Sequence, residues 1–199
     1  MLYYSIEHLD AIKEISNIAL GDSATSLSKL LKSKINMTVP SVNIVPINDF
    51  ISNIGEVEVI GKILLIKGDV EGSILLLFNI ETAKKIVKDF VVSSSLTQDE
   101  LDDMKISFIE EVCNIVGSTY IRNIADFLKI NVEIESSSLL YDNLTAILSY
   151  TFMEEEQFYD EVINIQTDFK YELDFQEMNV YFYFVPRKGN IDKIFNIKG

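Results

Sequence analysis

Several residue types that build common functional sites are scarce in this chain of 199 residues. It has one cysteine, one histidine, three prolines and no tryptophan. A single cysteine excludes an intramolecular disulfide framework and a thiolate metal cluster, and a single histidine excludes a multi-histidine metal site. Because no histidine lies near Cys113 in the sequence to activate it, we expect this thiol to be a core residue rather than a nucleophile.

Positive charge and long apolar runs are also scarce. Seventeen basic residues stand against 31 acidic ones, which gives a formal net charge of −14. This charge repels nucleic acid and anionic membranes, so we predict neither as a partner. The N-terminus lacks the pattern of a signal peptide, and apolar runs such as residues 74–78 are too short to span a bilayer. We therefore expect a cytoplasmic protein without membrane insertion.

The most informative feature that is present is a polar pattern that occurs twice at a constant offset of 97 residues. The matching positions are Asp10, Glu14 and Asn17 in the first copy and Ser107, Glu111 and Asn114 in the second (111 − 14 and 114 − 17 both give 97). A repeat at one fixed offset indicates two copies of an ancestral unit.

Each copy forms one polar stripe if the segment is helical. Positions i, i+4 and i+7 share a face of a helix, and apolar residues at spacings of three or four occupy the other side. We therefore expect both stripes to face solvent. A single exposed Glu and Asn would be unremarkable, because Asn often serves as a helix cap. Inside a helix Asn costs a few tenths of a kcal/mol relative to Ala, so its presence in both copies favours a functional reason.

This pattern resembles the signature of the CheC/CheX/FliY phosphatases of bacterial chemotaxis, Asp/Ser-x3-Glu-x2-Asn followed by 22 residues and a proline. In the first copy the proline is Pro40, and the similarity continues through residues 17–31, residues 68–72 and the surroundings of Asn114. The second copy departs from the pattern: Ser137 stands in place of the proline, and Ser118 in place of Gly21. Because it has two stripes in a chain of this length, the sequence resembles the CheC branch of the family.

The resemblance implies a phosphatase that dephosphorylates the aspartyl phosphate of a CheY-type response regulator. It implies that Asn17 and Asn114 orient the attacking water, that Glu14 and Glu111 pair with the regulator's active-site lysine, that Asp10 and Ser107 are supporting or partner-binding residues, and that Gly21 and Pro40 belong to the structural motif. It also implies that the regulator supplies the Mg²⁺, so that this chain binds no cofactor and no metal. Some members of the family bind the receptor deamidase CheD.

Two other functions remain open at this point. The chain could be a non-catalytic adaptor that binds CheD or a response regulator without hydrolysing phosphate. It could also be a self-contained metal-dependent hydrolase, although neither half gathers enough His, Asp or Glu at ligand spacing. Release of phosphate from a phosphorylated regulator separates the phosphatase from the adaptor.

We expect an α+β fold, internally duplicated and pseudo-two-fold, in which an antiparallel or mixed sheet packs with helices and two long exposed helices carry the sites. The chain reads as a single domain, residues 1–199, made of two repeats, about 1–94 and 95–199. The first repeat predicts helices at 5–19 and 23–33 separated by a break at Gly21-Asp22, an extended segment at 40–47, strands at 56–67 and 71–79 joined as a hairpin, and a helix at 81–91.

The second repeat predicts a similar order. After a linker at residues 93–95, a capping box at Thr97 to Glu100 opens the second stripe helix. The elements that we expect to follow it are a short helix at 119–129, an extended piece at 131–136, a helix at 142–157, strands at 160–170 and 176–186, and a last helix from Ile191.

Overall fold

A computed structural model describes the backbone of residues 5–53, 55–90, 98–153, 161–171, 174–187, 190 and 193–194. In this part of the chain the helices are α1 (Ile6–Leu31), α2 (Ile47–Asn53), α3 (Ile80–Phe90), α4 (Gln98–Leu128) and α5 (Leu144–Met153). The strands are β1 (Ile35–Pro46), β2 (Glu58–Gly68), β3 (Gly72–Asn79), β4 (Val132–Asn143), β5 (Glu161–Tyr171) and β6 (Asp174–Pro186).

All six strands form one antiparallel sheet with a two-fold order. The order is β1-β5-β6-β3-β2-β4. It reads the same from either end when β1 is exchanged with β4, β2 with β5, and β3 with β6. The two edge strands are also related by the sequence offset, because Ile35–Pro46 and Val132–Asn143 lie 97 residues apart at both ends. The prediction of a duplicated, pseudo-two-fold α+β fold is confirmed.

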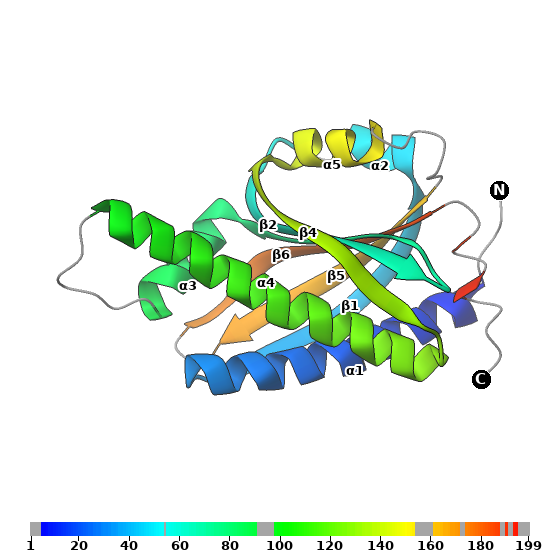
Figure 1. The fold of residues 1–199 in the computed structure, drawn as a ribbon, viewed down its shortest axis with the longest axis horizontal. Coiled ribbons are helices and arrows are strands. Elements are labelled where there is room, and N and C mark those ends of the chain that lie inside the picture. Colours follow the sequence, from blue (N-terminus) through cyan, green and yellow to red (C-terminus); the bar gives the residue numbers. More distant parts are fainter. Residues whose placement is uncertain are drawn as a thin grey trace.

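Two pairs of helices cover the two faces of the sheet (Figure 1). α1 and α4 lie side by side on one face, where the larger core cluster contains Leu20, Ile109 and Phe182. α2 and α5 cover the other face over a smaller cluster that includes Phe50 and Leu148. Because α1 and α4 turn their apolar sides to the sheet, their polar sides are directed away from it.

The long helix α1 begins at a capping box. The Ser5 hydroxyl accepts the backbone N–H of His8 at 3.3 Å, and Nδ1 of His8 accepts the backbone N–H of Ser5 at 3.4 Å. The first helical turn has no carbonyl partners for its N–H groups, so this exchange of hydrogen bonds stabilises the start of the helix. The only histidine of the chain is therefore part of a helix cap.

The predicted break at Gly21-Asp22 is wrong, because α1 continues through it to Leu31. A glycine in a helix interior costs about 1 kcal/mol relative to alanine, which is too little to stop a helix whose other side packs on the sheet. The predicted second short helix at 119–129 is wrong for the same reason: it is the continuation of α4. Both helices end at a lysine in the left-handed conformation, Lys32 (φ 49°) and Lys129 (φ 54°), again 97 residues apart.

Most of the remaining predicted elements are confirmed, one helix was missed, and some predictions lie outside the described residues. The β2–β3 hairpin, helix α3 and strands β5 and β6 are confirmed within a few residues, and α5 occupies part of the predicted helix at 142–157. Helix α2 was not predicted. The linker at 93–95 and Thr97 of the predicted capping box lie outside the described residues, as does most of the segment from Ile191. The repeat boundary near residue 94 stays a prediction for this reason.

Candidate functional site

The first stripe, Asp10, Glu14 and Asn17, lies on α1. Asp10 and Glu14 are exposed, whereas Asn17 is half-buried. On the opposite side of the same helical turns, Ile12 and Ile15 are buried. The stripe therefore faces solvent at its N-terminal end and meets neighbouring structure at Asn17.

The carboxamide of Asn17 is bound to the backbone of β1. Its Oδ1 accepts the N–H of Val39 at 2.7 Å, and its Nδ2 donates to the carbonyl oxygens of Lys13 at 3.0 Å and Val39 at 3.2 Å. Both N–H groups of the amide are therefore occupied, and one lone pair of Oδ1 remains open. The expectation that this amide simply faces solvent is wrong, because the edge strand that follows the helix passes beside it.

A β-bulge explains why an asparagine and a proline occur at this spacing. The β1–β5 ladder changes register between Thr38 and Ser41, where one residue of β1 is in excess. Pro40 has no N–H to contribute to a ladder, and a bulge on an edge strand is a place where proline is tolerated. Next to it, Val39 directs its backbone hydrogen bonds to Asn17 instead. The Asn-x22-Pro pattern therefore corresponds to a contact between the asparagine of the stripe and the bulged edge strand.

The second stripe, Ser107, Glu111 and Asn114, lies on α4 and is exposed at all three positions. Oδ1 of Asn114 accepts a hydrogen bond from Nζ of Lys62 at 2.8 Å. Its Nδ2 has no hydrogen-bond partner within the described part of the chain, so both N–H groups of this amide are open to solvent. The two asparagines therefore occupy equivalent positions but use their amides differently.

Lys62 is a lysine buried beneath the second stripe, and sequence analysis missed it. The residue is 4% exposed, and its Nζ lies 2.9 Å from Oε1 of Glu110 and 3.4 Å from Oγ of Ser137, in addition to Asn114. An ammonium group has three N–H donors, so these three acceptors match them all. A usable signal was present: a lone lysine inside the apolar run of residues 59–66. Lysine is almost never fully buried unless it is paired.

Ser137, which replaces the expected proline, lies in a more regular ladder than Pro40. It pairs with Leu64 of β2, and the extra residue of this edge strand is Glu135 instead. A serine keeps the backbone N–H that the ladder requires, whereas proline lacks it. Ser118, in the place of Gly21, donates its hydroxyl to the carbonyl oxygen of Asn114 at 2.6 Å. Ser118 therefore contacts Asn114 directly, and Ser137 shares Lys62 with it as a hydrogen-bond partner.

Neither Cys113 nor any acidic cluster adds a reactive centre to the described residues. Cys113 is fully buried, and burial raises the pKa of its thiol to about 12, although the nearby charge of Lys62 opposes this shift. The thiol therefore stays protonated at neutral pH, as expected for a core residue. No group of three or more His, Cys, Asp and Glu side chains in the described ranges is arranged to hold a metal ion.

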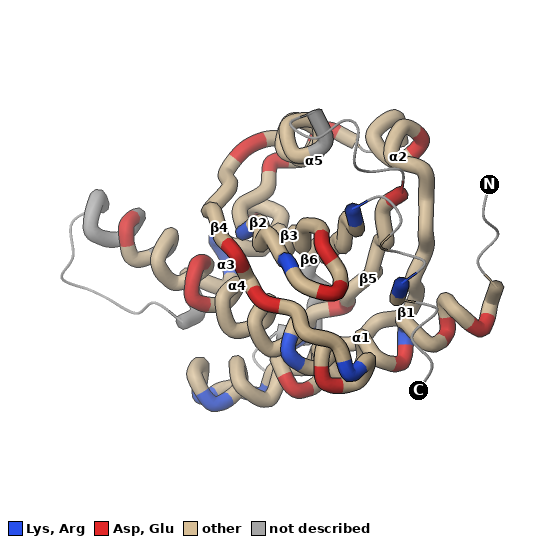
Figure 2. Tube along the Cα trace, turned by 45° about the vertical axis from the view of Figure 1, so that its right-hand side comes forward, with Lys and Arg blue, Asp and Glu red and all other residues tan. Residues whose placement is uncertain are grey.

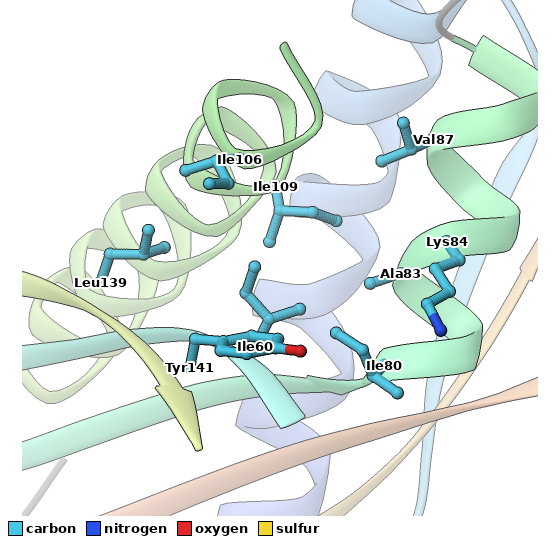
Figure 3. Close-up of a pocket in the computed structure, with 9 residues that line it drawn as sticks. All are labelled: Ile60, Ile80, Ala83, Lys84, Val87, Ile106, Ile109, Leu139 and Tyr141. Carbon is cyan, nitrogen blue, oxygen red and sulfur yellow. The ribbon is translucent and has the colours of Figure 1, made fainter. Parts of the chain in front are cut away.

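Acidic residues occur along both stripe helices (Figure 2), and an apolar cavity borders the second helix. The cavity has a volume of about 370 Å³ and lies between α3, α4 and the strands β2 and β4. Figure 3 shows Ile106 and Ile109 of α4 entering it from one side and Tyr141 from another. Ile106 directly precedes Ser107 in the chain, so the cavity opens beside the N-terminal end of the second stripe.

None of the helices in the described ranges is long and apolar enough to cross a membrane.

Comparison with known proteins relates both the first stripe and the fold to one group of proteins. Residues 7–44, which contain the first stripe and Pro40, match the model of the CheC-like family. The chain is 25% identical over 193 residues to the "CheY-P phosphatase CheC" of Bacillus subtilis, which covers 95% of this chain and 92% of that protein.

Two solved structures have the same fold. FliY of Thermotoga maritima superposes with a TM-score of 0.73 at 22% sequence identity, with 98% of each chain covered. CheX of Borrelia burgdorferi, in a complex with CheY, BeF3 and Mg²⁺, superposes with a TM-score of 0.50 at 16% identity and covers 87% of this chain and 99% of that one. This chain therefore shares its overall fold with these two proteins.

Proposed function

Because the chain belongs to the CheC/CheX/FliY family, we propose that it is a phosphatase that hydrolyses the aspartyl phosphate of a CheY-type response regulator. The observation that carries this proposal is the exposed Glu111–Asn114 pair on α4, one helical turn apart, with the amide N–H groups of Asn114 open to solvent. The name of the Bacillus subtilis relative and the CheX–CheY complex support the choice of partner.

The proposed hydrolysis requires little covalent catalysis from this chain. In the phosphorylated receiver, a water must attack phosphorus in line with the bond to the aspartate, whose carboxylate then leaves. Phosphoryl transfer of this kind depends mainly on positioning and on charge stabilisation. In this proposal the receiver holds its own Mg²⁺, which neutralises charge on the phosphoryl oxygens. What remains for this chain is to place one water.

Asn114 is suited to that task. A carboxamide does not titrate usefully near neutral pH, so it cannot be a general base, but it can donate to and accept from one water in a fixed geometry. Glu111 precedes it by one helical turn and is exposed. A carboxylate in this place can form a charge-assisted hydrogen bond with the lysine beside the receiver's phosphorylated aspartate. Ser107 then supports the contact with the receiver's surface.

The first stripe has the same Glu and Asn, with Asp10 in place of Ser107, but its asparagine is more constrained. Glu14 and Asp10 are exposed and can engage a receiver in the same way. Asn17, in contrast, has only one open lone pair on Oδ1, because Val39 and Lys13 occupy the rest of its amide. We therefore assign the larger share of catalysis to the second stripe.

That constraint also favours a second candidate function at the first stripe. A stripe whose asparagine is held by backbone could bind a receiver, or the deamidase CheD, without positioning a water. The chain would then be an adaptor at this stripe, and hydrolysis would depend on Asn114 alone.

The test follows phosphate release from a CheY-type receiver phosphorylated with acetyl phosphate, using wild type, Asn17→Ala, Asn114→Ala and the double variant. Asn114→Ala should lose at least about 10-fold in rate because a misplaced water loses most of the benefit of orientation, and the double variant should lose nearly all activity. Asn123→Ala is the matched control: it lies on the same helix, and within the described part of the chain its side chain donates only to the carbonyl of Thr119. Equal rates for wild type and the double variant would leave only the adaptor.

Asn17→Ala carries a second effect that must be separated from catalysis. The variant leaves the backbone groups of Val39 without their partner, so we expect it to lower the free energy of unfolding by about 1–3 kcal/mol. Glu14→Lys avoids this, because Glu14 is exposed and the reversed charge only repels the receiver's lysine. Urea titrations of the variants show which losses of rate come from stability.

A further inference from the structure

The two edges of the sheet carry different residues at the position of Lys62. On the edge that carries the second stripe, Lys62 pairs with Leu139 of β4. On the other edge, Val42, which lies 97 residues before Leu139, pairs with Ile165 of β5. Ile165 is 1% exposed. Lys62 therefore stands where the opposite edge of the sheet, beside the first stripe, has a buried isoleucine.

An isoleucine-sized position is an unfavourable place for a charge. Burying an ammonium group is costly unless it is paired and hydrogen-bonded. Here Glu110 supplies the opposite charge at 2.9 Å, and Asn114 and Ser137 supply the other two acceptors. Lys62 thus links α4 to the edge strand β4, just as Asn17 and Val39 link the equivalent elements α1 and β1 in the first repeat.

We propose that Lys62 is the positioning residue of the second stripe, where it fixes Asn114 as the backbone of Val39 fixes Asn17. This inference rests on the proposed phosphatase function. A charge-assisted hydrogen bond from Nζ directs Oδ1 of Asn114 inward, and this orientation sets Nδ2 outward, toward a docked receiver. Lys62 pairs with Glu110 and leaves the neighbouring Glu111 exposed for the receiver's own lysine.

The replacement of proline by serine fits the same assignment. Strand β1 has a bulge at Pro40, whereas β4 has none at the equivalent Ser137, which pairs regularly with Leu64 of β2. No backbone hydrogen bond joins Asn114 to β4 within the described residues, whereas two join Asn17 to β1. A side chain from β2 has taken over the contact, and the hydroxyl of Ser137 gives that side chain its third acceptor.

The experiment isolates the second stripe with Glu14→Lys as the parent and adds Lys62→Ile, the residue found at the equivalent position. Receiver dephosphorylation should lose roughly 10- to 100-fold in kcat, since the water is no longer held in place. KM for the phosphorylated receiver should change by less than about twofold, because Ser107 and Glu111 still make the contact. Lys67→Met is the control, a lysine of the same strand that is half-exposed and pairs with Glu133 and Glu135.

A second readout does not depend on catalysis. In isotope-labelled protein, the side-chain NH₂ signals of Asn114, assigned by their loss in Asn114→Ala, should shift in Lys62→Ile and stay in place in Lys67→Met. Lys62→Gln, which keeps an N–H donor without the charge, serves if Lys62→Ile fails to fold and should retain part of the rate. Unchanged kcat and unchanged NH₂ signals in a folded Lys62 variant would overturn the assignment. An inactive parent and wild type would instead refute the phosphatase function itself.

Discussion

At the scale of single residues, equivalent positions of the two repeats make different contacts. Asn17 binds the backbone of a bulged edge strand, and Asn114 binds a buried lysine. The polar stripes follow from helical periodicity, which is local, so they could be predicted from the sequence. The partners of the two asparagines lie 22 and 52 residues away and depend on strand register, so they could not.

Gly21 gives a residue-scale prediction. It lies in the interior of α1, is exposed, and an added Cβ would meet nothing within 4 Å. Gly21→Ala should therefore raise the free energy of unfolding by about 0.5–1 kcal/mol, because alanine loses less backbone entropy in a helix. Urea titration measures the change. Gly61→Ala is the contrasting variant and should destabilise strongly, because its Cβ would collide with the backbone of Leu76 and Leu77.

If Gly21→Ala leaves stability unchanged or lowers it, the continuous helix described here is wrong at that position. Dephosphorylation by the same variant is also informative. A loss of rate without a loss of stability would indicate that the receiver comes close to the backbone of α1 at Gly21.

At the scale of elements, a buried hydrogen bond between two side chains joins the two stripe helices. The hydroxyls of Ser16 on α1 and Tyr120 on α4 lie 2.9 Å apart, and both side chains are almost completely buried. The ring of Tyr120 also packs on Phe182 of the sheet, with centroids 4.4 Å apart. Because most of the surrounding contacts are apolar, this polar pair helps to set how the helices pack on each other.

Removing one partner of that pair should cost more than removing both. Tyr120→Phe leaves the hydroxyl of Ser16 buried without its partner, so we expect a loss of about 1–3 kcal/mol in the free energy of unfolding. Adding Ser16→Ala should restore part of this loss, because no unsatisfied hydroxyl remains. Urea midpoints of the single and double variants test this. A double variant that is less stable than Tyr120→Phe would show that the hydroxyl of Ser16 is satisfied in another way.

At the scale of the whole molecule, both stripe helices cover the same face of one two-fold sheet (Figure 1). Partners of the two stripes should therefore approach from the same side of the protein. Whether the stripes are far enough apart to bind two receivers at once stays a prediction. The buried core between helices and sheet also contains ionisable groups, and these make stability depend on pH.

Stability should fall in alkaline solution. Burial raises the pKa of Cys113 to about 12 and raises the pKa of Tyr120 and Tyr183 above the ordinary phenol value. The folded state therefore keeps protons that the unfolded chain releases above about pH 9 to 10. The contribution of each group to the stability of the folded state is fully present below the pKa that the group has in the unfolded chain. As the pH rises from there toward the pKa of the folded state, each group lowers the free energy of unfolding by about 1.4 kcal/mol per pH unit.

Urea midpoints between pH 7.5 and pH 10.5 measure this dependence. Tyr120→Phe, which removes one of the groups, should show a shallower decline than wild type over the same interval. A wild-type midpoint that stays constant up to pH 10.5 would contradict the burial of these side chains.

The sequence by itself determined the duplicated stripes, their helices, the β2–β3 hairpin and the α+β class, because each follows from periodicity or turn chemistry within a short segment. Only the tertiary structure decided the continuity of α1 through Gly21, since packing against the sheet outweighs the small local cost of a glycine. It also decided that Asn17 is held by Val39 and Asn114 by Lys62. These contacts depend on a bulge and on the register of the edge strands, which are set by long-range pairing within the sheet.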